Sequence, residues 1–435
     1  MKEIHRHIIL AGIICVAAVT LFLTFNRHAK SGCFNFQSEI WGDKAGYYVY
    51  LPAAINFRLN PANFPDSIDH KTGYGFRLDY INKKVLTKYT CGVAILQLPF
   101  YLTAELLSRV FHAGPEGYSV FHHRSIDVAA VFYLLLGMFF LAKYLGKKFT
   151  PGTVFFTLAG LFLATNLYYY SIDETGMSHI YSFAIFSLFL YTLQRTDFLF
   201  SPKTRDTMLL GILGGLIILI RPSNIVFLSV FFFLDTETTG DILLRIKRLL
   251  RPGIFLPVFL GVMFIMLPQM SYWVYAYGSP VSYTYGGEGF HWSHPKFLQT
   301  WFAPHNGLFL YSPFYLVLIA AMFLMIKKGI KNGMLILALF MAISYLFSSW
   351  WDPAFGCSFG ARSYVEYTTI FSIPLAHLFE SMRHAGRMKM IGFWLLVISL
   401  VILNLKMTYS YGGCFFGNTT WDWDAYLKIV TSPTK

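Results

Sequence analysis

Apolar segments of about the length that crosses a lipid bilayer recur along almost the whole chain of 435 residues. A transmembrane helix needs about 20 predominantly apolar residues. Backbone groups in lipid must be hydrogen-bonded within their own segment, so we expect helices. The sequence therefore predicts an all-α polytopic membrane protein with about 11 transmembrane helices. The segments are 8–25, 125–146, 153–170, 178–194, 207–220, 222–235, 253–275, 307–326, 332–349, 364–380 and 390–408.

The composition excludes a soluble enzyme of this size. Residues of the set AVILMFWYC make up 55% of the chain, only 13% are charged, and the mean hydropathy is +0.51. So few charges cannot cover a water-exposed surface. The formal net charge is +13, but the basic residues form small clusters between apolar runs and no nucleic-acid-binding motif occurs. We therefore expect no nucleic-acid partner.

The basic clusters predict the orientation. No small-residue cleavage site follows 8–25, so we expect an uncleaved first helix. With the N-terminus in the cytoplasm, the inner connections carry 18 basic and 7 acidic residues, whereas the rest of the chain carries 17 and 15. This asymmetry follows the positive-inside rule. It places a long first loop, about 26–122, outside. The same orientation places four cysteines outside, namely Cys33, Cys91, Cys357 and Cys414. The sequence does not decide whether they form disulfides or remain free thiols.

The sequence predicts a single transmembrane domain over 1–409 and a short external tail over 410–435. Segment 92–111 is apolar enough to span, but a crossing there would reverse the orientation of the basic clusters, so we expect an interfacial helix. Segments 207–220 and 222–235 are short and read as a hairpin that turns near the external face.

Acidic side chains mark the first two external loops. Asp43 and Glu39 follow the first helix among aromatic residues, and a carboxylate there can take a proton from a hydroxyl. The alternative is a solvated acid in an interfacial aromatic belt. Asp173, Glu174 and His179 lie in or beside the second loop, where they can bind a divalent cation or an acceptor. The alternative for Asp173 is capping of the next helix.

Basic side chains mark the same predicted face. Arg362, Lys88 and Arg221 are candidates for binding a lipid phosphate, since Arg offers it two parallel donors. The alternatives are ion pairs with Asp352 or Glu366, or extension to the membrane interface. A further candidate, His305, suits hydrogen bonding to a sugar.

The order of these motifs resembles the GT-C superfamily of integral-membrane glycosyltransferases, especially bacterial members related to protein O-mannosyltransferases and lipid A aminoarabinose transferases. The segments are WGDKAGYYVYLPA, KYTCGVAILQLPFYL, SIDETGMSHIYSF, RPSN, HNGLFLYSP and WWDPAFGCSFGAR. The resemblance implies a polyprenyl-phosphate-linked sugar donor and a site on the periplasmic side of a bacterial inner membrane. Two departures are Lys44 after Asp43, where many members have a second acid, and the short tail.

The resemblance also implies roles for residues. Asp43 corresponds to the catalytic base, with Glu39 the weaker match. The second-loop group assists acceptor or metal binding, and the basic group holds the donor phosphate. Together with the residues, this predicts transfer of a sugar, with inversion, to a glycan, lipid or protein acceptor at the bilayer surface. The residues identify no cofactor, and a divalent cation is compatible with them. The alternatives are a flippase or transporter for lipid-linked sugars, and a polysaccharide polymerase or ligase that relies on external Arg and His.

Overall fold

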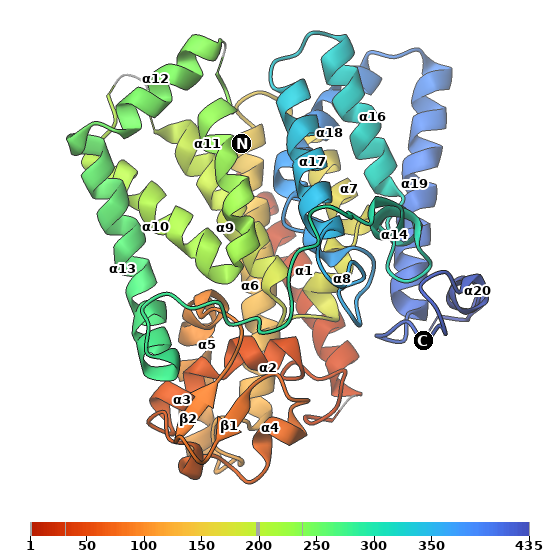
Figure 1. Ribbon diagram of the computed structural model, residues 1–435. Helices are drawn as coiled ribbons and strands as arrows, with labels where there is room; N and C mark the ends of the chain where they lie inside the picture. The colour runs from red at the N-terminus through yellow and green to blue at the C-terminus, as the bar shows by residue number, and fades with distance from the viewer. Residues whose placement is uncertain (1, 31, 197–200, 237, 435) are drawn as a thin grey trace.

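The structure is a computed structural model that describes residues 2–30, 32–196, 201–236 and 238–434, with side chains from residue 14 onward. Figure 1 shows a bundle of upright helices above a cap formed by the first loop. The longest helices are α1 (Lys2–Ala29), α5 (Gly92–Val110), α6 (Val120–Leu145), α9 (Ser178–Arg195), α13 (Pro252–Tyr277) and α19 (Arg387–Ser410). Those of intermediate length are α7 (Pro151–Ala164), α10 (Thr204–Ile220), α12 (Thr239–Leu249), α16 (Phe314–Lys327), α17 (Gly333–Ser348) and α18 (Thr368–Arg383).

Short helices complete the chain. They are α2 (Asp43–Tyr48), α3 (Tyr50–Ile55), α4 (Ile68–Lys71), α8 (Leu167–Ile172), α11 (Val230–Phe233), α14 (Phe297–Phe302), α15 (Leu308–Tyr311) and α20 (Trp423–Thr431), with 3-10 helices η1 (Pro61–Asn63), η2 (Pro222–Ser229) and η3 (Arg362–Tyr364). The helical character predicted from the apolar segments is confirmed.

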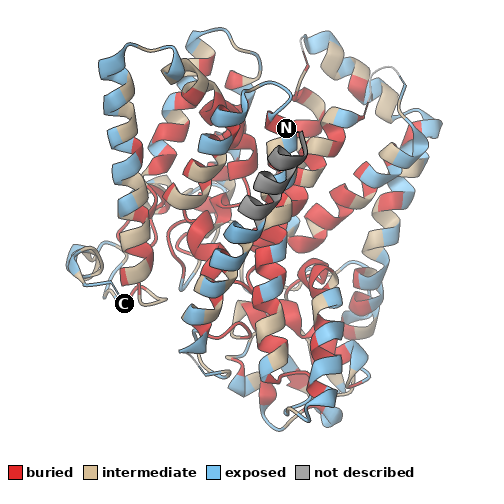
Figure 2. Ribbon diagram, turned by 180° about the vertical axis from the view of Figure 1, so that it is seen from behind, coloured by how far each residue is buried: buried red, intermediate tan, exposed pale blue. Residues whose placement is uncertain are grey.

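Among the described residues, four helices are long and apolar enough to cross a membrane: α5, α6, α13 and α19. Their outward faces carry large exposed apolar side chains, such as Phe259 and Phe264 on α13 and Leu395 and Ile402 on α19. Figure 2 shows exposed residues along the outer helices and buried residues inside the bundle. Exposed apolar faces of this extent are typical of a lipid-facing surface. The count of about 11 crossings and the cytoplasmic N-terminus stay predictions.

The first loop contains a small β-hairpin that the all-α prediction did not include. Strand β1 (Arg77–Asp79) pairs antiparallel with β2 (Lys84–Leu86). The Asp79 carboxylate accepts hydrogen bonds from the backbone and side-chain amides of Asn82 in the turn. Strands of three residues are too short to show an alternating apolar pattern. The hairpin packs against the end of α13, where the Tyr272 hydroxyl donates to the Val85 carbonyl at 3.1 Å.

Segment 92–111 forms one continuous helix, whereas the pair 207–220 and 222–235 is only partly α-helical. Segment 92–111 is α5, which packs along α6 and accepts a hydrogen bond from the Tyr133 hydroxyl at the Leu96 carbonyl (2.9 Å). Its interfacial position stays a prediction. The segments 207–220 and 222–235 do turn back on each other, but only the first is an α-helix throughout. The second begins as the 3-10 helix η2, with Pro222 in its first turn.

The C-terminal tail is bound to the bundle. Cys357 and Cys414 form a disulfide, so one of the pairings left open by the sequence is settled. Cys33 and Cys91 are free thiols, as is Cys15 in α1. The Tyr426 hydroxyl of α20 donates to the Leu310 carbonyl at 2.9 Å. The tail is thus tied to the loops that precede α16 and α18.

Helices α10 and α13 approach each other closely at two glycines. A Cβ on Gly261 would lie 2.4 Å from the Met208 carbonyl oxygen, and a Cβ on Gly211 would lie 2.2 Å from that of Val258. Small residues let the backbones of membrane helices come together, because lipid supplies no hydrophobic force between them. This contact holds α13 upright beside the first loop.

Gly261→Leu should therefore destabilise the protein. The added side chain has no space and forces the helices apart, at a cost of about 1–3 kcal/mol. Gly253→Leu is the matched control, because Gly253 lies at the start of the same helix and a Cβ there would meet nothing within 4 Å. The apparent unfolding temperature in detergent measures both. Equal temperatures for the two variants would contradict the close contact.

Candidate active site

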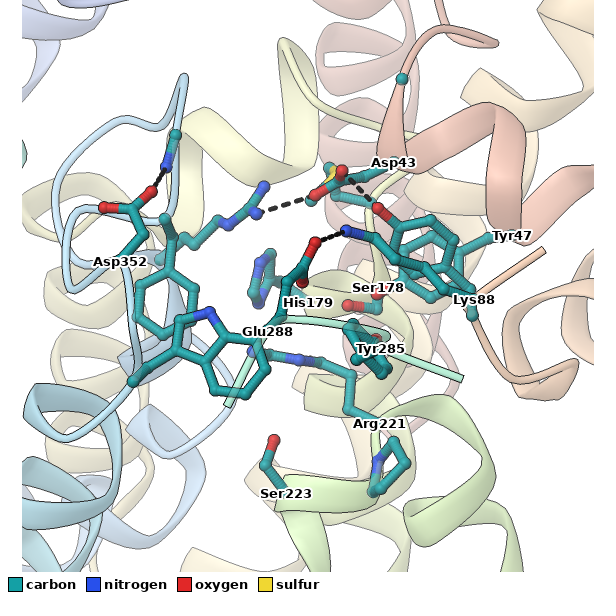
Figure 3. Close-up of a pocket in the computed structure, with 18 of the residues that line it drawn as sticks. Asp43, Tyr47, Lys88, Ser178, His179, Arg221, Ser223, Tyr285, Glu288 and Asp352 are labelled. Atoms are coloured by element: carbon teal, nitrogen blue, oxygen red, sulfur yellow. Dashed lines mark hydrogen bonds and ion pairs between the residues drawn. The ribbon is translucent and has the colours of Figure 1, made fainter. Parts of the chain in front are cut away.

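A cavity of about 970 Å³ lies where the loops at one end of the bundle meet the ends of the helices. Six of the charged or titratable residues singled out in the sequence line it: Asp43, Lys88, Glu174, His179, Arg221 and Arg362. Figure 3 shows several of them facing a common space, with Tyr47 and Tyr285 on one side. A mostly apolar wall with a few converging polar groups is typical of a ligand site.

Asp43 is held at the edge of this cavity by the first residues of α2. Gly42 precedes it with a φ of +54°, a conformation that glycine adopts without strain. One carboxylate oxygen accepts a hydrogen bond from the Tyr89 hydroxyl at 2.5 Å, and the other accepts one from Arg362 Nη2 at 2.7 Å. The side chain remains 35% exposed, and that exposed part faces the cavity that it lines.

These contacts keep Asp43 ionised. Burial acts to raise the pKa of its carboxyl, but the charge of Arg362 and the hydrogen bonds from Tyr89 and Arg362 outweigh it, and the pKa lies below its ordinary value. Burial raises the pKa of Tyr89 well above its ordinary value, so this hydroxyl remains a donor. The site thus presents a carboxylate rather than a carboxylic acid at neutral pH.

Lys88 lies beside Asp43 in the same space, near enough for its charge to act on the Asp43 carboxylate (Figure 3). Its ammonium pairs with Glu288 at 2.5 Å and sits 5.4 Å from the centre of the Tyr285 ring. Glu288 belongs to the polar loop between α13 and α14, whose Thr284 hydroxyl also donates to the Lys88 carbonyl at 2.6 Å. This loop therefore lines the cavity together with Lys88.

Arg221 and His179 share one acid. Glu366 accepts a hydrogen bond from Arg221 Nη1 at 2.9 Å and lies 2.9 Å from His179 Nδ1. The carboxylate is fully buried, so it needs both partners. The sequence left open an ion pair for the basic group, and for Arg221 that pair is present. Arg362 pairs instead with Asp43, while Asp352 accepts hydrogen bonds from the amides of its own loop.

The two acids of the second loop point to different places. Glu174 lines the cavity and pairs with the buried Lys44 ammonium at 3.0 Å. Asp173 pairs with Arg27 of α1, away from the cavity lining. Burial raises the pKa of Asp173 to about 6, against the charge of Arg27. The side chain of Asp173 caps no helix, so that alternative is absent. A cation or acceptor role for these residues stays a proposal.

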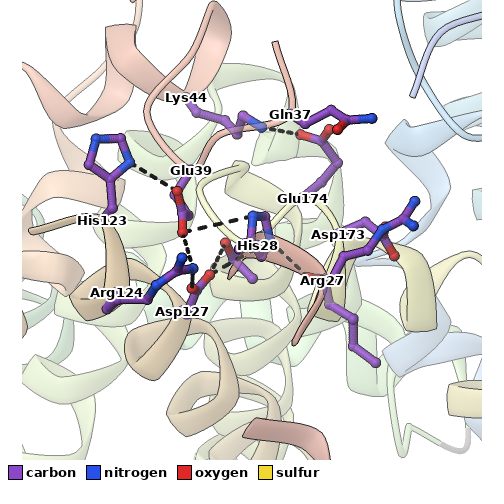
Figure 4. Close-up of polar contacts among 12 residues, drawn as sticks. Arg27, His28, Gln37, Glu39, Lys44, His123, Arg124, Asp127, Asp173 and Glu174 are labelled. Atoms are coloured by element: carbon purple, nitrogen blue, oxygen red, sulfur yellow. Dashed lines mark hydrogen bonds and ion pairs between the residues drawn. The ribbon is translucent and has the colours of Figure 1, made fainter. Parts of the chain in front are cut away.

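Two other predicted site residues lie outside the cavity lining. Glu39 is buried and contacts His123 and Arg124 of α6, at 2.9 and 2.8 Å (Figure 4). His305 stacks on Phe415, with ring centres 4.9 Å apart, and burial lowers its pKa. Neither is placed to meet a ligand bound beside Asp43.

Sequence reasoning missed two residues of the site. Tyr89, the hydrogen-bond donor to Asp43, directly follows Lys88, and this adjacency was the available signal. Glu288 lies in a loop rich in Gly and Tyr, and no feature of that loop marks it as the partner of Lys88.

Comparisons with known proteins give two solved structures. The chain is similar to the oligosaccharyltransferase of Archaeoglobus fulgidus in its apo form, with a TM-score of 0.44 and 13% identity. It is also similar to the oligosaccharyltransferase AglB of that organism in complex with an inhibitory peptide and a dolichol-phosphate, with a TM-score of 0.45 and 13% identity. The matches cover 97% of this chain but only 56% and 55% of the other two. No family model and no curated protein matches the sequence.

Glu366→Gln should destabilise the fold, because it removes the charge that Arg221 and His179 share in a buried place. Breaking a buried ion pair from one side costs about 3–5 kcal/mol. Glu380→Gln is the control, since Glu380 pairs with Arg383 in a partly exposed position near the end of α18. A lowered apparent unfolding temperature for the first variant alone is expected. An unchanged temperature would contradict the structural role of Glu366.

Proposed function

We propose that the chain is an integral-membrane glycosyltransferase that moves a sugar from a polyprenyl-phosphate-linked donor to an acceptor at the external face of the membrane. The observation that carries the proposal is that the ionised carboxylate of Asp43 lines the same cavity as Arg362, Lys88 and Arg221. Such a transfer requires a base that takes the proton of the acceptor hydroxyl and a cationic group that binds the phosphate.

The cationic side chains suit the leaving group. Arg362, Lys88 and Arg221 approach the cavity from three separate parts of the chain. Guanidinium groups bind phosphate oxygens through paired donors, and an ammonium adds a compact charge. In the proposal, they bind the donor phosphate and neutralise the charge that it gains when the bond to the sugar breaks.

Asp43 is the proposed base. The acceptor hydroxyl attacks the anomeric carbon, its proton passes to the Asp43 carboxylate, and the bond from that carbon to the phosphate oxygen breaks. Attack from the face opposite the phosphate inverts the centre. Arg362 contacts Asp43 in the structure, so a donor phosphate competes with the carboxylate for the same guanidinium. Binding of the donor then leaves Asp43 a stronger base.

Asp43→Asn should lower transfer by about 10²–10⁴-fold, the usual contribution of a general base. Purified protein is incubated with a panel of polyprenyl-phosphate sugars and cellular acceptor extracts, and released polyprenyl phosphate is measured by mass spectrometry. Asp66→Asn, an exposed acid of the same loop, is the matched control and should behave like the wild type. Near-normal transfer by Asp43→Asn would remove the assigned base. Loss with Arg362→Gln alone would favour the polymerase or ligase alternative.

The acid limb of the pH profile gives a second test. The pKa of Asp43 is lowered in the donor-free protein, so kcat/KM, which reports that state, should persist as pH falls to below about 4, the ordinary value for Asp. Arg362→Gln removes the main opposing charge and leaves burial, so the limb should move to higher pH. The limb is read from rates normalised to each variant's own maximum. If the acid limb lies at the same pH in both proteins, Arg362 does not set the pKa of Asp43.

A further inference from the structure

The helix α12 (Thr239–Leu249) lies at the end of the bundle farthest from the cap and is tilted across the upright helices (Figure 1). Its start is fixed by a capping box. The Thr238 hydroxyl accepts a hydrogen bond from the Asp241 amide, and the Asp241 carboxylate accepts one from the Thr238 amide. This segment is therefore a defined surface helix, and its outer face is available to a partner.

One row of α12 carries large apolar side chains that the described part of the chain leaves uncovered. Leu243, Ile246 and Leu250 are 57%, 39% and 69% exposed. Their spacing of three and four residues places them along one side of the helix. Ile242 and Leu249, on the adjoining side, pack against the core. The helix thus has an inner apolar face for the bundle and an outer apolar row that meets something else.

Arg245 determines which side of α12 points outward. Its buried guanidinium donates from Nη1 to the carbonyl oxygens of Phe231 at 2.7 Å and Leu234 at 2.8 Å. These carbonyls lie at the end of α11, where a helix has no partners of its own for them. A rotation of α12 that buried Leu243 would break both hydrogen bonds, so the apolar row is held outward.

Basic side chains border the apolar row. Lys247 is four residues after Leu243, and Arg251 is four residues after Lys247, so the two form a neighbouring row. Both are exposed, and no carboxylate pairs with either within the ranges that the structure describes. The chain then enters α13, whose exposed Phe255 and Phe259 belong to its lipid-facing surface. The apolar row of α12 is therefore continuous with a surface that lipid covers.

We propose that α12 lies in the surface of the bilayer, on the side opposite the cap, with its apolar row inserted and with Lys247 and Arg251 bound to the phosphates of anionic lipids. Amphipathic helices with Lys or Arg beside an apolar face bind such surfaces. Each basic residue near an anionic leaflet adds about fivefold in affinity. An acidic protein would attract the same two charges, but continuity with α13 favours lipid. The proposal stands independently of the glycosyltransferase proposal.

The first test measures the depth of the apolar row in lipid nanodiscs that hold the full-length protein. A nitroxide label is attached in Ile246→Cys, with Cys15→Ser and Cys33→Ser to remove the accessible thiols. Its collisions with oxygen, which concentrates in lipid, are compared with those with a water-soluble nickel chelate. Ile81→Cys is the matched control, because Ile81 is 93% exposed in the turn of the cap hairpin.

Oxygen collisions should dominate at position 246 and nickel collisions at position 81. Dominance of nickel at position 246 would place the row in water and overturn the proposal. Few collisions with either reagent at position 246 would mean that protein covers the row, and would overturn it as well.

The second test measures the preference for lipid charge. The full-length protein in neutral detergent is titrated with phosphatidylglycerol or phosphatidylcholine, and the apparent unfolding temperature is recorded. Lys247→Gln combined with Arg251→Gln should raise the phosphatidylglycerol concentration for half-maximal stabilisation by at least about fivefold, with no change for phosphatidylcholine. Lys71→Gln combined with Arg77→Gln, which removes one Lys and one Arg from the cap, is the matched control. Equal phosphatidylglycerol responses in the two double variants would overturn the assigned headgroup contacts.

Discussion

The ion pair between Asp43 and Arg362 joins the two halves of the site. The residues are 319 positions apart, and the pair brings the start of α2 against η3. A carboxylate in this partly buried place is stable only with a cation nearby. Each residue therefore requires the other. The pair positions the walls of the cavity, and the same two side chains are the ones proposed to contact the substrate. The charges that define the site also help to hold the resting fold together.

Glu39 and Asp43 are four residues apart but belong to different clusters. Glu39 turns inward to α6 and contacts His123 and Arg124, whereas Asp43 turns to the cavity and contacts Tyr89 and Arg362. Gly42 allows the backbone to change direction between them. One short segment therefore connects a buried ionic cluster to the cavity.

The apolar segments predicted the helices because a bilayer imposes both their length and their hydrogen bonding. The same reasoning identified Asp43, Lys88, Arg221 and Arg362 as candidate site residues, because charged side chains near a bilayer are costly unless they are paired or functional. It offered Glu366 as a partner for these cations, which Arg221 has, but it did not find the pairs Asp43–Arg362 and Lys88–Glu288. Asp127 lies within the predicted segment 125–146, where the apolar pattern gives no sign of its partners His28 in α1 and Thr175 in the loop before α9. Contacts between distant segments depend on packing, which local sequence patterns do not encode.

The disulfide between Cys357 and Cys414 has a consequence for biogenesis. Both cysteines line the cavity, and Arg362 follows the first by five residues. The two cysteines are 57 residues apart, and α18 and α19 lie between them, so both helices must be synthesised and packed before this wall can be cross-linked. Such bonds persist in oxidising compartments. Completion of this cavity wall therefore follows the packing of both helices and requires the oxidation of two thiols.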